Sequence, residues 1–435
     1  MSHLAPGPCR SSRPRAALVL AFGAALLALV VPRGASAALS LDDALRLAEQ
    51  RSSLLPAREA SASAARERSV AAGRRPDPML SASLTNLPVT GEDRFSVTRD
   101  FMTMRSVGIK QELTRGSKLE ARAGRYEREA ELAEADRALA RLQLRRETAV
   151  AWFDRAFREQ VHAALLTRRD EARLQVEAAD AVYRGGRGPQ TDVFAARSGV
   201  EQLGDRIAEA DRNVATARTR LARWVGPAAD AALGPAPDVS AVTLRDDALE
   251  AALERHPQLE LMRRREAVAA AATQVARTDR TSDLSVEVMV SQRGPAYSNM
   301  VSINLSMPLQ WDRRNRQDRE VAATLAVAAQ LRNEREEATR VLVAEALTLL
   351  QEWRSDRQRL GHYDAALLPL TSERTRAALA AYRGGNGSLA AVLQAREAEI
   401  AIRLDRLALA LEAARRWAAI TYLMPDDRPL GETQR

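Results

Sequence analysis

The chain has 435 residues, a formal net charge of +8 and a hydrophobic content of 46%, but only 4% of its residues are aromatic. Its arginines alternate with aspartates and glutamates along the predicted helices, which is typical of a solvated helical surface rather than of a basic nucleic-acid stripe. We therefore exclude nucleic acid as a partner. Cys9 is the only cysteine and lies in a predicted leader, so the mature chain has neither disulfides nor thiolate metal sites.

Residues 1–37 have the order of a secretory signal peptide. A basic segment with three arginines precedes an apolar run at residues 16–31, and small residues at 35–37 provide a cleavage site. The apolar run is too short to span a bilayer comfortably. Removing this leader, which carries four arginines and no acidic residue, lowers the formal net charge to +4. No later run of 18 apolar residues predicts a transmembrane helix, so we expect an exported protein that is periplasmic, secreted or held in the outer membrane by strands.

The first repeat is predicted to span residues 38–226. It begins with a helix at about residues 40–72, which has acidic residues in its first turn. Extended segments follow at 79–87 and 105–113, and a helix at about 117–182 should be roughly 100 Å long at 1.5 Å per residue. After a glycine-rich turn, apolar residues keep 3-4 spacing from Val193 to Trp224, which predicts a coiled-coil seam.

The second repeat, predicted at residues 242–424, follows the same order. Its first helix covers about residues 245–277, and His256-Pro257 is expected to bend it. Extended segments with strict alternation lie at 284–290 and 301–307. A long helix at about 315–381 contains Pro369, where we expect a bend or a local loss of hydrogen bonding. The 3-4 spacing returns between Ile400 and Ala418. An irregular, proline-containing linker at 227–241 joins the repeats, and a polar tail follows at 425–435.

The four extended segments have one apolar and one polar face, and their nine or ten residues suit an outer-membrane strand. Four strands cannot close a barrel by themselves, and an open sheet edge is not tolerated in lipid. If the segments enter the membrane, several chains must therefore share one barrel. The alternative is a pair of soluble hairpins.

Two glycine-rich turns share one register, 199 positions apart, and both end on a Val-x-x-Ala-Arg sequence. Glycines allow the sharp reversal of a helical hairpin, and the repeated frame indicates an internal duplication. An ordinary pair of unrelated helical turns is the plainer alternative. The turns consist of Tyr183, Arg184, Gly185, Gly186, Arg187, Gly188 and Thr191 in the first repeat and of Tyr382, Arg383, Gly384, Gly385, Asn386 and Gly387 in the second.

In this combination of signal peptide, duplication, paired strands and long hairpins, the chain resembles the TolC-type outer-membrane factor family over nearly its whole mature length. The resemblance implies a mainly α fold with a small β part, in which a homotrimer forms a 12-stranded β-barrel in outer-membrane lipid. That barrel continues into an α-helical barrel in the periplasm. The implied function is a passive duct of a tripartite efflux system, with no enzymatic activity. Its implied partners are a periplasmic adaptor (membrane fusion) protein that docks on the hairpin tips and a resistance-nodulation-division type pump in the inner membrane.

The tips resemble the family's tip motif, a glycine pair followed by a Thr-Asp-Val run. Thr191-Asp192-Val193 matches that run, whereas Ala391 and Gln394 replace residues that are often acidic in the family. Asp192 is therefore the candidate for the tunnel mouth, and a full acidic ring is not expected there. A plain helix N-cap is the alternative role for Asp192.

The chain also resembles the heavy-metal-efflux branch of the family, but only over short segments at residues 76–79, 86–88 and 98–105. Methionine thioethers suit Cu(I) or Ag(I), although packing is their commoner role, and the three later histidines lack ligand spacing. We predict no cofactor, no protein metal site and no catalytic residue. The alternatives are a periplasmic coiled-coil adaptor or scaffold and an organic-solute duct of the same fold. The strand-region methionines are Met79, Met102, Met104, Met289, Met300 and Met307.

Overall fold

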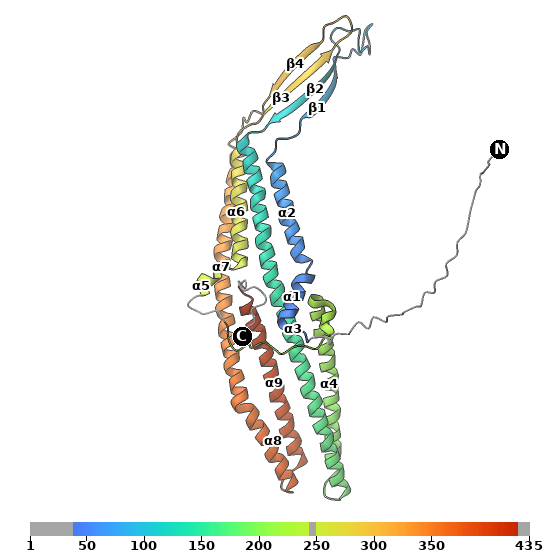
Figure 1. Ribbon diagram of the computed structural model, residues 1–435, viewed down its shortest axis with the longest axis vertical. Coiled ribbons are helices and arrows are strands. Elements are labelled where there is room, and N and C mark those ends of the chain that lie inside the picture. The colour runs from blue at the N-terminus through green and yellow to red at the C-terminus, as the bar shows by residue number, and fades with distance from the viewer. Residues whose placement is uncertain (1–37, 243–248, 425–435) are drawn as a thin grey trace, which may run out of the picture. The chain divides into compact units, whose positions relative to one another are not determined.

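The computed structural model describes residues 38–242 and 249–424 (Figure 1). The predicted signal peptide at 1–37, the first residues of the second repeat at 243–248 and the tail at 425–435 lie outside the described residues. In the part of the chain that is described, no helix is long and apolar enough to span a bilayer.

The first repeat contains α1 (Leu41–Arg51), α2 (Leu54–Ala72), β1 (Met79–Thr85), β2 (Met104–Leu113), α3 (Gly116–Arg184) and α4 (Gln190–Val225). Ser40 caps α1, because its hydroxyl accepts a hydrogen bond from the Asp43 backbone N–H at 3.1 Å. The prediction of one continuous helix at 40–72 is wrong. Ser52 takes an extended conformation, and serine side chains compete with the helical backbone, so α1 and α2 are separate helices.

The second repeat contains α5 (Leu249–Leu253), α6 (Pro257–Thr278), β3 (Leu284–Gln292), β4 (Met300–Ser306), α7 (Gln317–His362), α8 (Leu368–Arg383) and α9 (Leu389–Thr421). His256 and Pro257 separate α5 from α6 rather than bend one helix. Pro257 occupies the first position of α6, where its missing N–H costs nothing. A π-helical turn at Tyr363–Leu367 precedes Pro369 and confirms the expected local irregularity of the backbone hydrogen bonds.

His256 is the buried cap of α6. Its Nδ1 accepts a hydrogen bond from the Gln258 backbone N–H at 3.1 Å, and its side chain is 4% exposed. Burial, with a smaller contribution from the positive charge of Arg146, lowers the pKa of His256 to about 4. Arg146, Glu345 and Tyr422 are the other ionisable residues that line the same groove.

We expect stability to fall as the pH is lowered through this range. The unfolded histidine has a pKa near 6.5 and binds a proton before the folded one does, so the contribution is complete above about pH 6.5 and is lost towards pH 4. The loss should be about 1–3 kcal/mol. Denaturant titrations from pH 7.5 to 4 should show a shallower pH slope for His256→Asn, which keeps a capping acceptor. His256→Ala should be weaker at every pH, and equal slopes for the wild type and His256→Asn would contradict the assignment.

The four strands form one antiparallel sheet in the order β1-β2-β3-β4, so β2 and β3 join the two repeats. The pairing register aligns Leu80, Ile109, Val288 and Ile303 in one row and Ala82, Val107, Val290 and Val301 in the next, on the same face. Most of these side chains are exposed; Ile303 is 68% exposed. The opposite face carries serines, and the Ser106 and Ser291 hydroxyls lie 2.8 Å apart. The sheet thus has an unburied apolar face and a polar face.

The main core lies where α1 meets the middle of α3 and the ends of α4 and α9. Trp152 and Phe153 are fully buried in it, and their rings pack edge to face with centroids 5.4 Å apart. The linker is fastened to this core rather than being loose. Trp152 Nε1 donates to the Leu39 carbonyl at 3.1 Å, Leu39 forms a parallel bridge with Leu233, and Trp417 Nε1 donates to the Ala241 carbonyl at 2.9 Å.

Candidate functional site

Both hairpin tips use the same turn. Gly185 and Gly384 end α3 and α8, and the next glycine takes a left-handed conformation, with φ of 68° at Gly186 and 77° at Gly385. Backbone hydrogen bonds of 3.0 Å from Arg187 to Val182 and of 2.9 Å from Asn386 to Ala381 close the two turns. This is the glycine-terminated helix end that the sequence predicts.

The third glycine of each tip has a packing role. A Cβ at Gly188 would lie 2.8 Å from Val182 Cγ1, and one at Gly387 would lie 3.0 Å from the Tyr382 nitrogen. The returning helices differ in their caps, since Ser388 caps α9 with its hydroxyl whereas Pro189 begins α4 without a side-chain cap. Asp192 is therefore not an N-cap, and it lies in the first turn of α4, where the helix dipole favours a carboxylate.

The two tips are packed against each other. Ala179, Val193, Ala196, Leu389 and Val392 form one buried cluster that draws on α3, α4 and α9. Tyr382 is half-buried beside this cluster, whereas the Tyr183 side chain is 41% exposed. Arg184, Arg187, Thr191, Arg383 and Asn386 are exposed or nearly so. The two hairpins therefore share an apolar base next to the predicted site residues of both repeats.

An ion cluster above the tips was missed by sequence reasoning. Arg396 Nη1 lies 2.5 Å from Glu171 Oε2, and Arg168 lies 3.3 Å from the same carboxylate. Burial, reinforced by the neighbouring charge of Arg396, lowers the pKa of Arg168. A groove of about 340 Å³ lies beside the cluster, between α3, α4 and α9. Arg396 is the final arginine of the duplicated motif, so the sequence did contain a signal for this cluster. The equivalent arginine of the first copy, Arg197, is exposed and forms no ion pair with the described residues.

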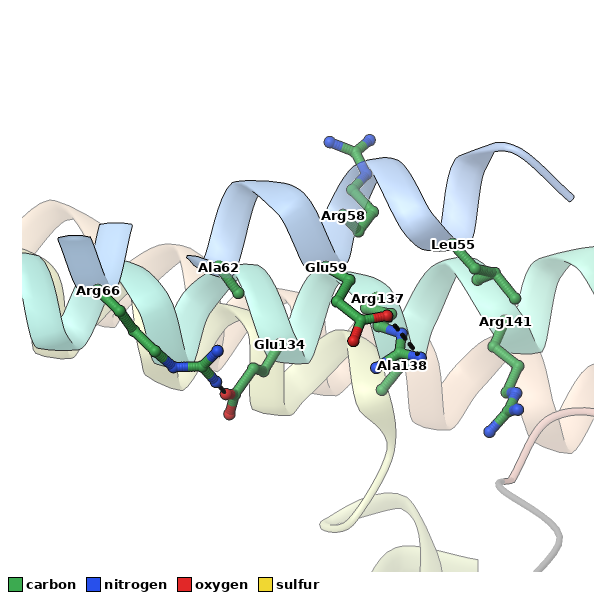
Figure 2. A pocket seen from close by; sticks show the side chains of 9 residues that line it. All are labelled: Leu55, Arg58, Glu59, Ala62, Arg66, Glu134, Arg137, Ala138 and Arg141. Carbon is green, nitrogen blue, oxygen red and sulfur yellow. Dashed lines mark hydrogen bonds and ion pairs between the residues drawn. The ribbon is translucent and has the colours of Figure 1, made fainter. Parts of the chain in front are cut away.

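A second groove, of about 380 Å³, lies between α2 and α3 (Figure 2). Figure 2 shows the arginines of both helices beside the small side chains of Ala62 and Ala138. The Arg137 and Glu59 side chains pair at 3.2 Å, Arg66 pairs with Glu134, and the other two arginines pair with carboxylates outside the groove. The groove thus presents satisfied charges rather than a free charge for a ligand.

The polar face of the sheet holds most of the strand methionines. By the register, Met79, Met104, Met289 and Met300 share the face of the serines, whereas Met307 continues the apolar positions. Met289 fits over Gly108, where a Cβ would lie 2.5 Å from Met289 Cγ, and its sulfur accepts a hydrogen bond from Asn304 Nδ2 at 3.6 Å. Met289 therefore has the packing role that is commoner for methionine, on the polar rather than the apolar face of the sheet.

Comparisons with known proteins agree with this architecture. Residues 35–227 match the family model described as "Outer membrane efflux protein". No curated protein sequence matches the chain. Among solved structures, the outer-membrane channel OprN is 16% identical with a TM-score of 0.73, covering 88% of this chain and 89% of its own. The outer membrane protein VceC from Vibrio cholerae is 17% identical with a TM-score of 0.72, and the match covers 88% of this chain and 95% of VceC. CusC is 16% identical with a TM-score of 0.72, and the match covers 89% of this chain and 92% of CusC. The predicted fold class, long helices with four antiparallel strands, is confirmed.

Proposed function

We propose that the chain is a TolC-type member of the outer membrane efflux protein family, whose model matches residues 35–227, and that it is the outer-membrane channel of a tripartite efflux system. It is a passive, non-enzymatic duct, with its sheet in the outer membrane and its helical hairpins in the periplasm. One observation carries this proposal: in the described part of the chain, a four-stranded sheet with an exposed apolar face and two unpaired edges adjoins two long helical hairpins. A soluble scaffold would not expose an apolar face of this kind to water.

A homotrimer is the assembly that completes the sheet. The β1 and β4 edges are unpaired within the described residues, and open edges are not tolerated in lipid. Three chains would close a 12-stranded barrel with the apolar faces outward and the serines towards the lumen. Because the mature chain has no cysteine, paired cysteines can test the seam: Ser83→Cys on β1 combined in turn with Ser302→Cys or Asn304→Cys on β4. A covalent trimer in the membrane fraction is expected, and monomers from every pair, extractable by salt, would refute the proposal.

The tips are proposed to dock the periplasmic adaptor, which couples the duct to a resistance-nodulation-division type pump of the inner membrane. Their exposed arginines, Tyr183 and Asn386 supply polar contacts, and the shared apolar cluster fixes their spacing. Asp192 is proposed to line the tunnel mouth.

Replacing both Gly186 and Gly385 by tryptophan is expected to abolish adaptor cross-linking and export. Both positions face open space, so the added ring would project into the partner rather than into this chain. The matched control is the double alanine variant, which carries the same strain of a positive φ, about 1 kcal/mol per residue, without the bulk. Cross-linking yield and export should survive in the alanine variant. Equal behaviour of the two variants would remove the tips from the docking site.

Heavy-metal cations of the copper and silver class are proposed as cargo, with organic solutes as the alternative. The support is chemical: the methionines of the polar face place soft thioether sulfur on the proposed lumen side. Met289 and Met300 are diagonal neighbours on adjacent strands, within reach for long side chains.

Replacing Met289 and Met300 together by leucine is expected to lower tolerance to copper and silver severalfold while leaving tolerance to organic toxicants unchanged. Leucine keeps the volume and removes the sulfur, so assembly should be unaffected. Met307→Leu on the apolar face is the control, and the measurement is the minimal inhibitory concentration in a deletion strain complemented with each variant. If deletion of the gene leaves metal tolerance unchanged but lowers tolerance to organic compounds, the cargo is organic and the duct proposal stands.

A further inference from the structure

The four connections between strands and helices form a belt at one end of the sheet. Gln111 donates to the Pro76 carbonyl at 2.8 Å, Ser282 to the Pro308 carbonyl at 2.6 Å, and Gln310 to the Asp279 carbonyl at 3.0 Å. The first bond ties the segment before β1 to the end of β2, and the other two tie the segment before β3 to the segment after β4. The Lys118 side chain, which follows β2, joins the two pairs by donating to Asp283 at 2.6 Å. The side chains of this belt therefore have defined neighbours.

Three carboxylates of the belt already pair with cations. Lys118 is 5% exposed and its Nζ lies 2.6 Å from Asp283, Arg122 lies 3.5 Å from Asp279, and Arg280 lies 2.9 Å from Asp318. A second group of cations has no such partner. Within residues 38–242 and 249–424, the exposed side chains of Arg74, Arg75, Arg115, Arg314 and Arg316 form no ion pair. The carboxylates nearest to them in sequence are Asp77, Glu112, Asp312 and Asp318.

A row of apolar residues that begins on β4 ends just before two of these arginines, Arg314 and Arg316. Every second residue from Val301 to Trp311 is apolar, and the exposed fractions run from 69% at Val301 to 88% at Trp311. Leu309 and Trp311 extend this row beyond the end of β4. A tryptophan at the edge of an apolar band suits the boundary between acyl chains and headgroups, where its ring is buried and its N–H is hydrated. Guanidinium groups bind phosphate oxygens in pairs, which matches them to the headgroup phosphates just beyond that boundary.

We propose that Trp311 and the five free arginines form a collar that binds the phosphates of anionic phospholipids in the leaflet on the helical side of the sheet. The inference rests on the proposed placement of the sheet in the outer membrane. The collar would fix the depth and tilt of the sheet, because the tryptophan marks the boundary and the arginines hold it from the aqueous side. Its occupant is a lipid headgroup rather than free phosphate, because the cations adjoin an apolar band that continues into the bilayer.

The test compares the full chain with the variant Arg74→Gln/Arg75→Gln/Arg314→Gln/Arg316→Gln in mild detergent. We expect phosphatidylglycerol, but not phosphatidylcholine, to raise the melting temperature of the wild type and to remain bound in native mass spectrometry. Each arginine should contribute about fivefold in apparent affinity, so the variant, which lacks four of them, should bind phosphatidylglycerol about 600-fold more weakly. High salt should weaken the wild-type effect, because exposed charges are screened. Trp311→Gln should also reduce retention of phosphatidylglycerol.

The matched control is Arg220→Gln/Arg374→Gln, which removes two exposed arginines that form no ion pair with the described residues and lie on α4 and α8. It should bind phosphatidylglycerol like the wild type. The collar would be overturned if phosphatidylglycerol raised the melting temperature of the four-arginine variant as much as that of the wild type, or if inorganic phosphate alone reproduced the rise. If the variant dissociates into monomers, the arginines contact a neighbouring chain rather than lipid, and the collar is also overturned. A wild type that is monomeric and released by salt would instead refute the proposed channel.

Discussion

Replacing Arg155 by leucine is expected to lower the free energy of unfolding by about 3–5 kcal/mol. Arg155 is 2% exposed, and its two Nη atoms donate to the Ala229 carbonyl at 2.6 Å and to the Ala231 carbonyl at 2.8 Å. Its Nε also donates to Glu159 at 2.8 Å. Leucine would leave two carbonyls without donors, one of them fully buried, and a carboxylate without its partner. The linker between the repeats would lose its main polar attachment.

Urea unfolding of the detergent-solubilised protein, followed by tryptophan fluorescence, measures this loss. Arg212→Leu is the control, because Arg212 is 71% exposed and its pairing with Glu209 contributes little. Arg155→Lys should lie between the two, since an ammonium keeps the charge but cannot reach both carbonyls as a planar fork does. A midpoint for Arg155→Leu that matches Arg212→Leu would show that the linker is held by Trp152 and Trp417 alone.

Replacing Ile303 by arginine is expected to prevent stable insertion of the assembled channel. Ile303 is 68% exposed in the centre of the apolar face, and a charge near the middle of a bilayer costs about 2–4 kcal/mol per chain. Three chains would bear this cost together in the proposed trimer. The amount of protein that resists salt washing and runs as a trimer in mild detergent should fall at least tenfold.

Ser302→Arg is the matched control, because it places the same side chain one residue away on the polar face. It should assemble normally and change only the lumen charge. If Ser302→Arg is lost and Ile303→Arg assembles, the two faces of the sheet are assigned the wrong way round. If both assemble equally, the sheet does not lie in lipid.

The sequence alone predicted the elements that depend on local chemistry. Alternation in residues 284–290 and 301–307 indicated strands with one apolar face, since side chains point to opposite faces of a strand in turn. The glycine triplets indicated both hairpin tips, because a helix that reverses sharply needs a residue tolerant of positive φ. The shared register of the two tips predicted a duplicated fold. Each of these properties is set by neighbours within a few positions.

Only the tertiary structure decided the properties that depend on distant partners. It pairs β2 with β3 and so joins the repeats into one sheet, and it separates α1 from α2 at Ser52. It pairs Arg396 with Glu171 while Arg197 stays exposed, although the two arginines occupy equivalent places in the motif. It also places Met289 over Gly108. A sequence pattern indicates which face of a helix or strand a residue occupies. Which residue it contacts on a neighbouring element depends on how the helices and strands pack, and the local spacing of residues does not determine that packing.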